Sequence, residues 1–238
     1  MKIALLGYGK MGKEIEKVAL SNGHSIVLKV SSSNSDFDSS ELSNADVAIE
    51  FSKPELAISN IKKCFQAQVP IVVGTTGWYH DYQSIEKLCR QQNQSLLYAT
   101  NFSIGVNLFF KLNEQLAKMM KNHPAYSIEV EEIHHTQKLD APSGTGISIA
   151  EQIIANNSTK ESWVNRVSEN ENELSIVSKR IDDVPGTHSV YYKSTTDEIE
   201  IKHTAHNRSG FAIGAVLAAE WIASNKGGIY TMNDVLSF

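Results

Sequence analysis

Cysteine is scarce in this chain, and basic charge is not in surplus. Only two cysteines occur in 238 residues, Cys64 and Cys89, and both fall in segments whose patterns predict helices. We therefore expect no disulfide framework and a reducing compartment. The formal net charge is −5 and no basic block occurs, which argues against nucleic acid as a partner.

Long apolar runs are missing as well. No stretch approaches the ~20 consecutive apolar residues that a membrane-spanning helix needs, so we expect no membrane partner. The residues from Met1 to Leu6 lead straight into a glycine motif, unlike a signal peptide, and we expect a cytoplasmic protein. The 41% apolar and 21% charged residues are typical of a globular protein. The length suffices for one large domain or two modest ones.

The first motif that is present is a glycine-rich turn. The apolar run at residues 2–6 predicts a buried parallel strand, and a helical pattern begins at residue 11. The G-x-G-x-x-G hexapeptide between them consists of Gly7, Tyr8, Gly9, Lys10, Met11 and Gly12. Its glycines allow a tight turn, a close backbone approach to a pyrophosphate and close helix–strand packing, and a helix start favours anions. The motif predicts a dinucleotide site; a glycine-rich turn without a ligand is the alternative.

The end of the second predicted strand, residues 25–30, departs from the usual dinucleotide pattern. An Asp or Glu normally stands there to bind the adenosine ribose, whereas this chain has Ser31, Ser32 and Ser33. Without a carboxylate nothing repels a 2′-phosphate, and serine hydroxyls can donate to one. No arginine stands there to bind it, so the choice between NADH and NADPH stays open.

Further strands are predicted at residues 46–51, 69–73 and 96–99, and they alternate with helical patterns. This order specifies a doubly wound parallel sheet. In such sheets ligands bind outside the carboxyl ends of the strands. The loop from Gly74 to Gly77 follows one strand, so we expect it to pass close to a nicotinamide; a simple strand-to-helix turn is the alternative.

The predicted order of helices and strands changes after residue 103. A helix is predicted at 104–120, a strand at 126–133 and a helix at 143–156, followed by a polar, loop-like segment at 158–173. Strands at 174–178, 189–192 and 198–202 indicate an open mixed sheet, which must be covered or paired; we expect subunits to associate through it. The apolar helix at 210–222 is expected to pack on the first domain.

The expected fold is therefore α/β, with an N-terminal Rossmann-like doubly wound parallel sheet and a second α+β domain with an open mixed sheet. Residues 1–103 and 211–238 would form the dinucleotide-binding domain. Residues 104–210 would form the substrate-binding and oligomerisation domain. The site is expected in the cleft between the two.

Proton-handling groups are concentrated at residues 131–145. His134, His135 and Lys138 can donate protons and stabilise developing negative charge, and the Ser143–Thr145 segment at a helix start can bind a carboxylate. Beside a nucleotide domain, this pattern predicts hydride transfer to a small polycarboxylate.

Plainer readings of these residues are also open. The histidines could be structural, or could ligate a metal with Glu131 or Asp140, although no HExxH or paired-cysteine spacing occurs. Glu131 and Glu132 are interpreted as a strand edge that faces solvent. A separate group, His203, His206 and Arg208, is interpreted as surface or interdomain residues.

The segment from Glu132 to Thr145 resembles the signature of the 4-hydroxy-tetrahydrodipicolinate reductases, or dihydrodipicolinate reductases, of the diaminopimelate route of lysine biosynthesis. The resemblance covers essentially the whole chain, although the chain is short for the family. The other matching segments, in the family's order, are Gly7–Gly12, Gly74–Gly77, Asn101–Asn107, Ile199–His203 and Gly214–Val216.

The resemblance implies an NADH- or NADPH-dependent reductase of 4-hydroxy-tetrahydrodipicolinate that forms a homotetramer through its second-domain sheet and needs no metal. It implies that His134 is the catalytic acid/base and Lys138 the proton donor. The implied substrate-binding residues are His135, Ser143, Gly144 and Thr145. The implied cofactor-binding residues are Gly7, Tyr8, Gly9, Lys10, Met11, Gly12, Gly74, Thr75, Thr76, Ala99, Thr100, Asn101 and Phe102.

Two other functions are weighed against this one. A non-catalytic nucleotide-binding sensor would keep the glycine motif but would not need His134 and Lys138. Another two-domain NAD(P)-dependent oxidoreductase is the second alternative. An acyl-phosphate dehydrogenase of that kind would want a nucleophilic cysteine at the nicotinamide, and Cys64 and Cys89 are expected in helices away from it.

Overall fold

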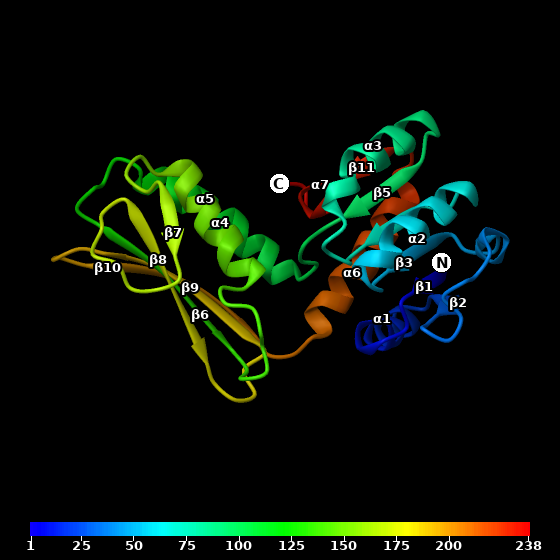
Figure 1. The fold of residues 1–238 in the computed structure, drawn as a ribbon, viewed down its shortest axis with the longest axis horizontal. Coiled ribbons are helices and arrows are strands. Elements are labelled where there is room, and N and C mark those ends of the chain that lie inside the picture. Colours follow the sequence, from blue (N-terminus) through cyan, green and yellow to red (C-terminus); the bar gives the residue numbers. More distant parts are fainter. The chain divides into compact units, whose positions relative to one another are not determined.

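The computed structural model describes residues 1–238, which form two compact units. The first unit contains Met1–Ile104 and Arg208–Phe238, and the second contains Gly105–Asn207. The chain therefore leaves the first unit once and returns to it once (Figure 1). None of its helices combines the length and the apolar character that crossing a membrane requires.

A six-stranded parallel sheet forms the centre of the first unit, with the order β11-β5-β4-β3-β1-β2. Its strands are β1 (Lys2–Leu6), β2 (Ser25–Val30), β3 (Val47–Glu50), β4 (Ile71–Val73), β5 (Ser95–Tyr98) and β11 (Gly228–Tyr230). β11 was not predicted, because its three residues are all half-buried and too short to give a pattern. The chain steps from β1 to β2 on one side and then to β3 on the other, so the ligand crevice of such sheets lies at the ends of β1 and β3.

Helices cover both faces of this sheet. The longer ones are α1 (Lys10–Ser21), α2 (Pro54–Gln66), α3 (Tyr82–Gln91) and α6 (Ser209–Ser224); the short ones are η1 (Ser39–Leu42), η2 (Tyr79–Asp81) and α7 (Met232–Val235). Alternate residues of β1 enter different cores: Ile3 and Leu5 pack with α1 and α6, whereas Ala4 and Leu6 pack with α2 and α3. This period of two is the signature of a strand buried on both faces.

Both cysteines lie where they were expected. Cys64 is on α2 and Cys89 is on α3, and both are buried free thiols. Burial raises the pKa of the Cys89 thiol to about 11. These thiols therefore serve as packing groups.

α6 packs closely because its residues are small. It is the predicted apolar helix, and Ala212, Ala215 and Ala219 are fully buried against the sheet. A Cβ atom on Gly214 would lie 1.7 Å from the carbonyl oxygen of Phe102. The absence of a side chain at Gly214 thus sets how near α6 lies to the segment after β5.

The second unit is built on a five-stranded mixed sheet with the order β10-β9-β6-β8-β7. Its strands are β6 (Ser127–His134), β7 (Ser162–Val164), β8 (Glu173–Arg180), β9 (Gly186–Lys193) and β10 (Glu198–Ala205). β8 runs parallel to β6 and β7, whereas β9 runs antiparallel to β6 and β10. The prediction of a loop throughout 158–173 was wrong at β7, a short edge strand whose partly exposed residues show no alternation.

Two helices, α4 (Ile104–Met120) and α5 (Gly144–Asn156), lie on one face of this sheet (Figure 1). Val130 of β6, Ile176 of β8 and Val190 of β9 are fully buried in the core beneath them. No helix of the second unit covers the opposite face. That face carries ion pairs, including Lys179 Nζ to Glu131 Oε2 at 2.5 Å and Lys193 Nζ to Glu129 Oε1 at 3.6 Å.

Replacing Gly214 with alanine should destabilise the protein, because the new methyl group would enter the backbone of Phe102. Overpacking of this kind costs about 2 kcal/mol or more. Urea denaturation followed by circular dichroism measures the free energy of unfolding.

The matched control is Gly210→Ala in the first turn of the same helix. A Cβ there would lie 3.5 Å from Ser103 Oγ, which is ordinary contact, so we expect no loss, or a gain of up to about 1 kcal/mol from helix propensity. Equal effects of the two substitutions would contradict the role given to the close approach at Gly214.

Candidate active site

The glycine motif forms a cradle with room above its centre. Gly7 has φ +107°, and a Cβ there would lie 2.1 Å from the Phe51 carbonyl oxygen; one on Gly12 would lie 2.3 Å from the Gly7 carbonyl oxygen. A Cβ on Gly9 would meet nothing within 4 Å, and Gly9 caps α1 without a side-chain hydrogen bond. Two glycines therefore close the turn and the third leaves space at a helix start, which fits a pyrophosphate.

The other predicted cofactor residues follow the neighbouring strands β4 and β5. Gly74, Thr75 and Thr76 come directly after β4, and the segment from Ala99 to Phe102 comes directly after β5. Because β1, β3, β4 and β5 are adjacent and parallel, their carboxyl ends bring these segments and the Gly7 turn to one edge of the sheet. A Cβ on Gly74 would lie 2.2 Å from the Phe51 ring, so its loop runs close to β3.

Glu50, the last residue of β3, is a member of this edge that sequence reasoning missed. Its side chain is fully buried, and burial raises the pKa of its carboxyl. Its Oε1 accepts from the Ser52 backbone N–H at 3.1 Å and from Asn60 Nδ2 at 3.3 Å. The Ser52 N–H also lies 2.8 Å from Thr75 Oγ1, so Glu50 links the ends of β3 and β4. The signal available in the sequence was an acidic residue at the end of an apolar strand.

No carboxylate stands in the turn directly after β2. The Ser31 backbone N–H donates to Asn34 Oδ1 at 2.7 Å, and the hydroxyls of Ser31 and Ser33 are 2.8 Å apart. Ser32 and Ser33 are exposed. The turn therefore presents hydroxyl groups and no carboxylate.

In the second unit, the predicted proton-handling segment begins where β6 ends at His134. Lys138 closes a turn by donating its backbone N–H to the His135 carbonyl at 3.1 Å. Its Nζ lies 2.8 and 3.0 Å from the two carboxylate oxygens of Asp140, and this contact lowers the pKa of Asp140. Arg180, the last residue of β8, donates to the Asp140 carbonyl at 2.6 Å. The loop is thus tied to the neighbouring strand.

The predicted carboxylate anchor is the start of α5. We call Gly144 and Thr145, the first residues of that helix, the α5 mouth. A Cβ on Gly144 would meet nothing within 4 Å, so an anion has room to reach the backbone N–H groups. Ser143 is the N-cap and accepts from the Gly146 N–H at 3.1 Å. Its hydroxyl is buried and engaged inside the protein, so substrate contact by Ser143 stays a prediction.

Glu132 does not face solvent, and that part of the sequence interpretation was wrong. Glu132 is 0% exposed, whereas Glu131 on the opposite face of β6 pairs with Lys179. Strict alternation along the strand places Glu132 on the face of Ile128 and Val130, beneath α5. That alternation was the signal that could have found it.

The Glu132 carboxylate is rich in hydrogen bonds. It accepts from the Ser143 backbone N–H at 3.0 Å to each oxygen, from the Ser143 hydroxyl, and from Ser178 Oγ at 2.8 Å. Burial alone would raise the pKa of Glu132, but these donors outweigh it and the pKa is lowered. Glu132 is therefore an ionised carboxylate in the interior.

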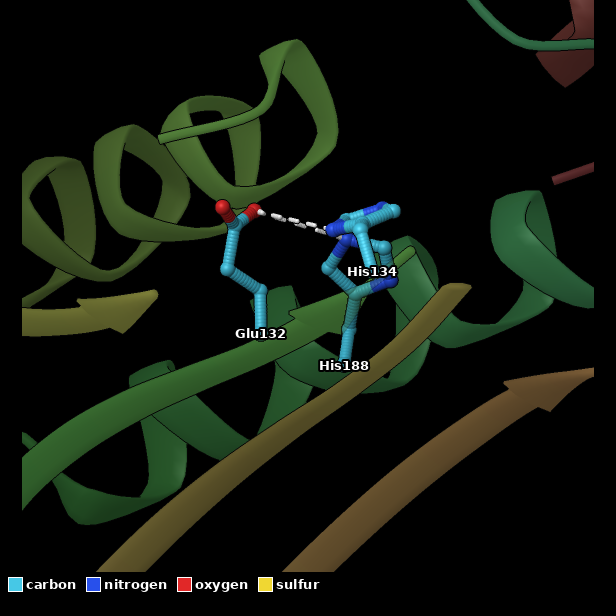
Figure 2. A group of neighbouring side chains, drawn as sticks. All are labelled: Glu132, His134 and His188. Carbon is cyan, nitrogen blue, oxygen red and sulfur yellow. Dashed lines mark ion pairs between the residues drawn. The ribbon is translucent and has the colours of Figure 1, made fainter. Parts of the chain in front are cut away.

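Two histidines face this carboxylate, as Figure 2 shows: His134 from β6 and His188 from β9. His134 Nδ1 lies 3.9 Å and His188 Nε2 3.8 Å from Glu132 Oε2, and the two rings are 5.1 Å apart. Burial lowers the pKa of both, that of His188 to about 3. His188 was missed by the sequence interpretation, although it opposes Glu132 in the register of β6 and β9.

Glu132, His134 and His188 also have the composition of a metal-ligand set, with ligand atoms within 4.8 Å of one another. The shared oxygen, however, already accepts the Ser143 hydrogen bonds, which an ion would have to displace. The two acids that the sequence suggested as metal ligands are not part of this set. Glu131 is paired with Lys179, and Asp140 is paired with Lys138. The geometry fits a proton-handling cluster better than a metal site.

The last group singled out in the sequence lies at the end of β10 and just beyond it. His206 and Arg208 are exposed. His203 is half-buried, with its ring 6.3 Å from that of Phe109. No contact joins these residues to the Glu132 carboxylate.

Comparisons with known proteins cover both units. The description "dihydrodipicolinate reductase, N-terminus" matches residues 1–102, and "dihydrodipicolinate reductase, C-terminus" matches residues 105–236. The 4-hydroxy-tetrahydrodipicolinate reductase of Christiangramia forsetii is 49% identical over 240 residues, which is 100% of this chain and 98% of the relative. That of Methanosarcina barkeri is 39% identical over 197 residues, covering 82% and 74%.

Solved structures share the fold. The dipicolinate-bound dihydrodipicolinate reductase from Paenisporosarcina sp. TG-14 has a TM-score of 0.78 at 21% identity and covers 97% of each chain. An engineered D-amino acid dehydrogenase bound to NADP+ has a TM-score of 0.53 at 14% identity, covering 97% of this chain and 92% of its own. The predicted pair of a Rossmann-like sheet and a mixed sheet is thus confirmed.

His188→Gln should make the protein less sensitive to acid. The folded state holds the pKa of His188 at about 3 instead of its ordinary 6.5, so the unfolded chain takes up this proton first. Wild type therefore loses stability as the pH falls from 6.5 towards 3, by on the order of a few kcal/mol. Urea denaturation at several pH values measures the difference between variant and wild type.

The control for that experiment is His123→Gln, because His123 is exposed. We expect its difference from wild type to stay constant over the same range. Carboxylates that do not contact position 188 titrate alike in all three proteins and cancel. A His188→Gln difference that does not move with pH would refute the neutral, buried state of His188.

Proposed function

The chain belongs to the dihydrodipicolinate reductase family, and on that premise we propose how its residues share the work of the reaction. The reaction is the NAD(P)H-dependent reduction of 4-hydroxy-tetrahydrodipicolinate to tetrahydrodipicolinate in lysine biosynthesis. A hydride and a proton are taken up, and the 4-hydroxyl group leaves as water. The observation that carries this function is the full-length match to the Christiangramia forsetii reductase. A nucleotide sensor or another class of dehydrogenase is not favoured.

The first unit binds the cofactor. The open space at Gly9 and the positive φ of Gly7 support a pyrophosphate at the start of α1. The strand-end segments Gly74–Thr76 and Ala99–Phe102 bind the nicotinamide half, and Tyr8, Lys10, Met11 and Gly12 complete the turn. When bound, the reduced nicotinamide supplies the hydride.

The second unit binds the substrate, a small dicarboxylate. The Paenisporosarcina enzyme binds dipicolinate, which is a planar ring with two carboxylates. One carboxylate of the substrate binds at the α5 mouth, where Gly144 leaves the helix start open, with the Thr145 backbone and Ser143 beside it. His135 contacts the other end of the substrate.

Proton transfer falls to Lys138 and His134. The Asp140 ion pair holds the Lys138 ammonium at the turn after β6, and from there Lys138 donates the proton that completes the reduced product. His134 is neutral in the free enzyme because burial lowers its pKa. It can therefore accept a proton and return it as the acid/base of the reaction.

Both NADH and NADPH are accepted, with no strong discrimination. The turn at Ser31–Ser33 has no carboxylate that would repel a 2′-phosphate and no arginine that would bind it. Serine hydroxyls can donate hydrogen bonds to a ribose hydroxyl or to a phosphate.

The enzyme works in the cytoplasm as a homotetramer assembled through the second-unit sheet. No helix of that unit covers the face that carries Val177 and Tyr191, and the edge strands of such an open sheet can pair with another chain. Val177 lies among charged residues, several of which are paired within the chain. Their neutralisation makes burial of the face less costly.

Purified protein should oxidise NADH and NADPH when the substrate is generated in situ with dihydrodipicolinate synthase. Lys138→Ala should lower kcat by about 100-fold or more, since general acid catalysis contributes 10²–10⁴-fold. Loss of absorbance of the reduced nucleotide measures the rate with each cofactor.

The matched control is Lys121→Ala, because Lys121 is an exposed lysine just after α4; it should be fully active. Binding of the reduced nucleotides, followed by fluorescence, should be unchanged in Lys138→Ala. Oxidation of neither nucleotide by wild type would disprove the function. Loss of nucleotide binding in Lys138→Ala would disprove the division of labour between the units.

Val177→Asp should break the tetramer, because it places an unpaired charge within the proposed interface. Native mass spectrometry should report a tetramer for wild type and smaller species for the variant. Val167→Asp is the control, since Val167 is 70% exposed in the segment after β7. A monomeric wild type would refute the assembly.

A further inference from the structure

We propose that Glu132 is a positioning residue that holds the two halves of the active site, the α5 mouth and the His134 imidazole, in one arrangement. The inference rests on the proposed function of His134 and the α5 mouth. It concerns a residue that touches neither substrate nor cofactor and acts through its neighbours.

A buried carboxylate requires a reason, because removing a charge from water is costly. Glu132 has 0% exposure, yet its pKa is lowered because the hydrogen bonds of Ser143 and Ser178 outweigh burial. An apolar residue would fill this core position at less cost. A perturbed, fully satisfied carboxylate beside the candidate catalytic histidine is the kind of group that functional sites retain.

The link to the α5 mouth runs through Ser143. Glu132 accepts both its backbone N–H, at 3.0 Å, and its hydroxyl, while the same hydroxyl caps α5 by accepting from the Gly146 N–H at 3.1 Å. A Cβ on Gly146 would lie 2.8 Å from Glu132 Oε2. The helix can approach the carboxylate this closely only because position 146 has no side chain, so Glu132 fixes where the α5 mouth lies.

The link to the proton-handling half runs through His134 Nδ1. This atom is buried, has no hydrogen-bond partner and faces Glu132 Oε2 at 3.9 Å (Figure 2). A movement of about 1 Å brings it to hydrogen-bond distance. A hydrogen bond from Nδ1–H to Glu132 would fix the tautomer and leave Nε2 for the chemistry. On the other side of the ring, a Cβ on Gly186 would lie 3.2 Å from Nε2, so a side chain at position 186 would crowd the ring.

The surrounding charges make this carboxylate the partner of a protonated His134. The groups that face Glu132 are His134 on β6, His188 on β9, Arg180 and Ser178 on β8, and Ser143 on α5. Lys138 and Arg180 both disfavour the imidazolium form of His134, whereas Glu132 and Asp140 favour it. Burial keeps His188 neutral, and Glu132 is the negative charge that most favours a proton on His134.

Glu132→Gln keeps the size of the side chain but removes its charge. Its amide N–H₂ also replaces one acceptor with a donor, so a Ser143 or Ser178 donor loses its partner. We expect kcat to fall by about 10- to 100-fold, the size of effect seen for partners that orient metal-ligating histidines, and the substrate KM to rise. The acidic limb of the kcat pH profile should move to lower pH, because the negative charge that favoured imidazolium is gone. Binding of NADH and NADPH should not change.

Ser143→Ala separates the two links. It removes the hydroxyl that joins Glu132 to the Gly146 N–H at the start of α5 but keeps the carboxylate beside His134, so the substrate KM should rise while the pH limb stays in place. If Glu132 acts on the mouth through Ser143, the KM effects of the two substitutions will be less than additive in the double variant. If Glu132 contributed only to the stability of the fold, its substitution would not shift the acidic limb, and the two KM effects would be additive.

The matched control is Glu151→Gln on the exposed side of α5, which should behave as wild type. Should Glu132→Gln fail to fold, Glu132→Asp replaces it, with the same changes expected at smaller size. Wild-type KM, kcat and pH limb in a folded Glu132 variant would overturn the proposal. A wild-type protein without reductase activity would instead overturn the proposed function.

Discussion

The second unit is organised around one costly group, the ionised Glu132 carboxylate with no exposure to solvent. Its donors come from two elements, Ser143 at the start of α5 and Ser178 on β8. Satisfying the carboxylate therefore requires α5 to begin directly above β6. The same geometry places the open start of α5 and the end of β6, where His134 lies, in one small region. The residues that stabilise the buried carboxylate therefore also form part of the candidate active site.

Glycines, which have no side chain, determine close approaches in both units. Gly12 lets α1 approach the Gly7 turn, Gly214 lets α6 approach Phe102, and Gly146 lets α5 approach Glu132. Gly9 and Gly144 have a different role, because each leaves open space at a helix start. Backbone N–H groups at such starts attract anions. The proposed pyrophosphate site of the first unit and the proposed carboxylate site of the second thus rest on the same feature.

Sequence patterns predicted most of the fold because the responsible signals are local. The apolar runs, the glycine turn and the small-residue helix α6 each lie within a short window. The misses were β7 and β11, which have three residues each and are only partly buried, so neither periodicity nor propensity marks them. Glu132 was misread for another reason: its charge was weighed more heavily than the alternation that puts it beneath α5.

By itself, the sequence determined the glycine turn, the alternation of most strands and helices along the chain, and the presence of His134, Lys138 and the α5 mouth in one segment. Only the tertiary structure decided that His134, Ser178, Arg180 and His188 surround Glu132. These residues lie on three strands, and the pairing register of β6 with β8 and β9 brings them together. Register results from burial of a whole sheet face, so no single segment of the chain contains it.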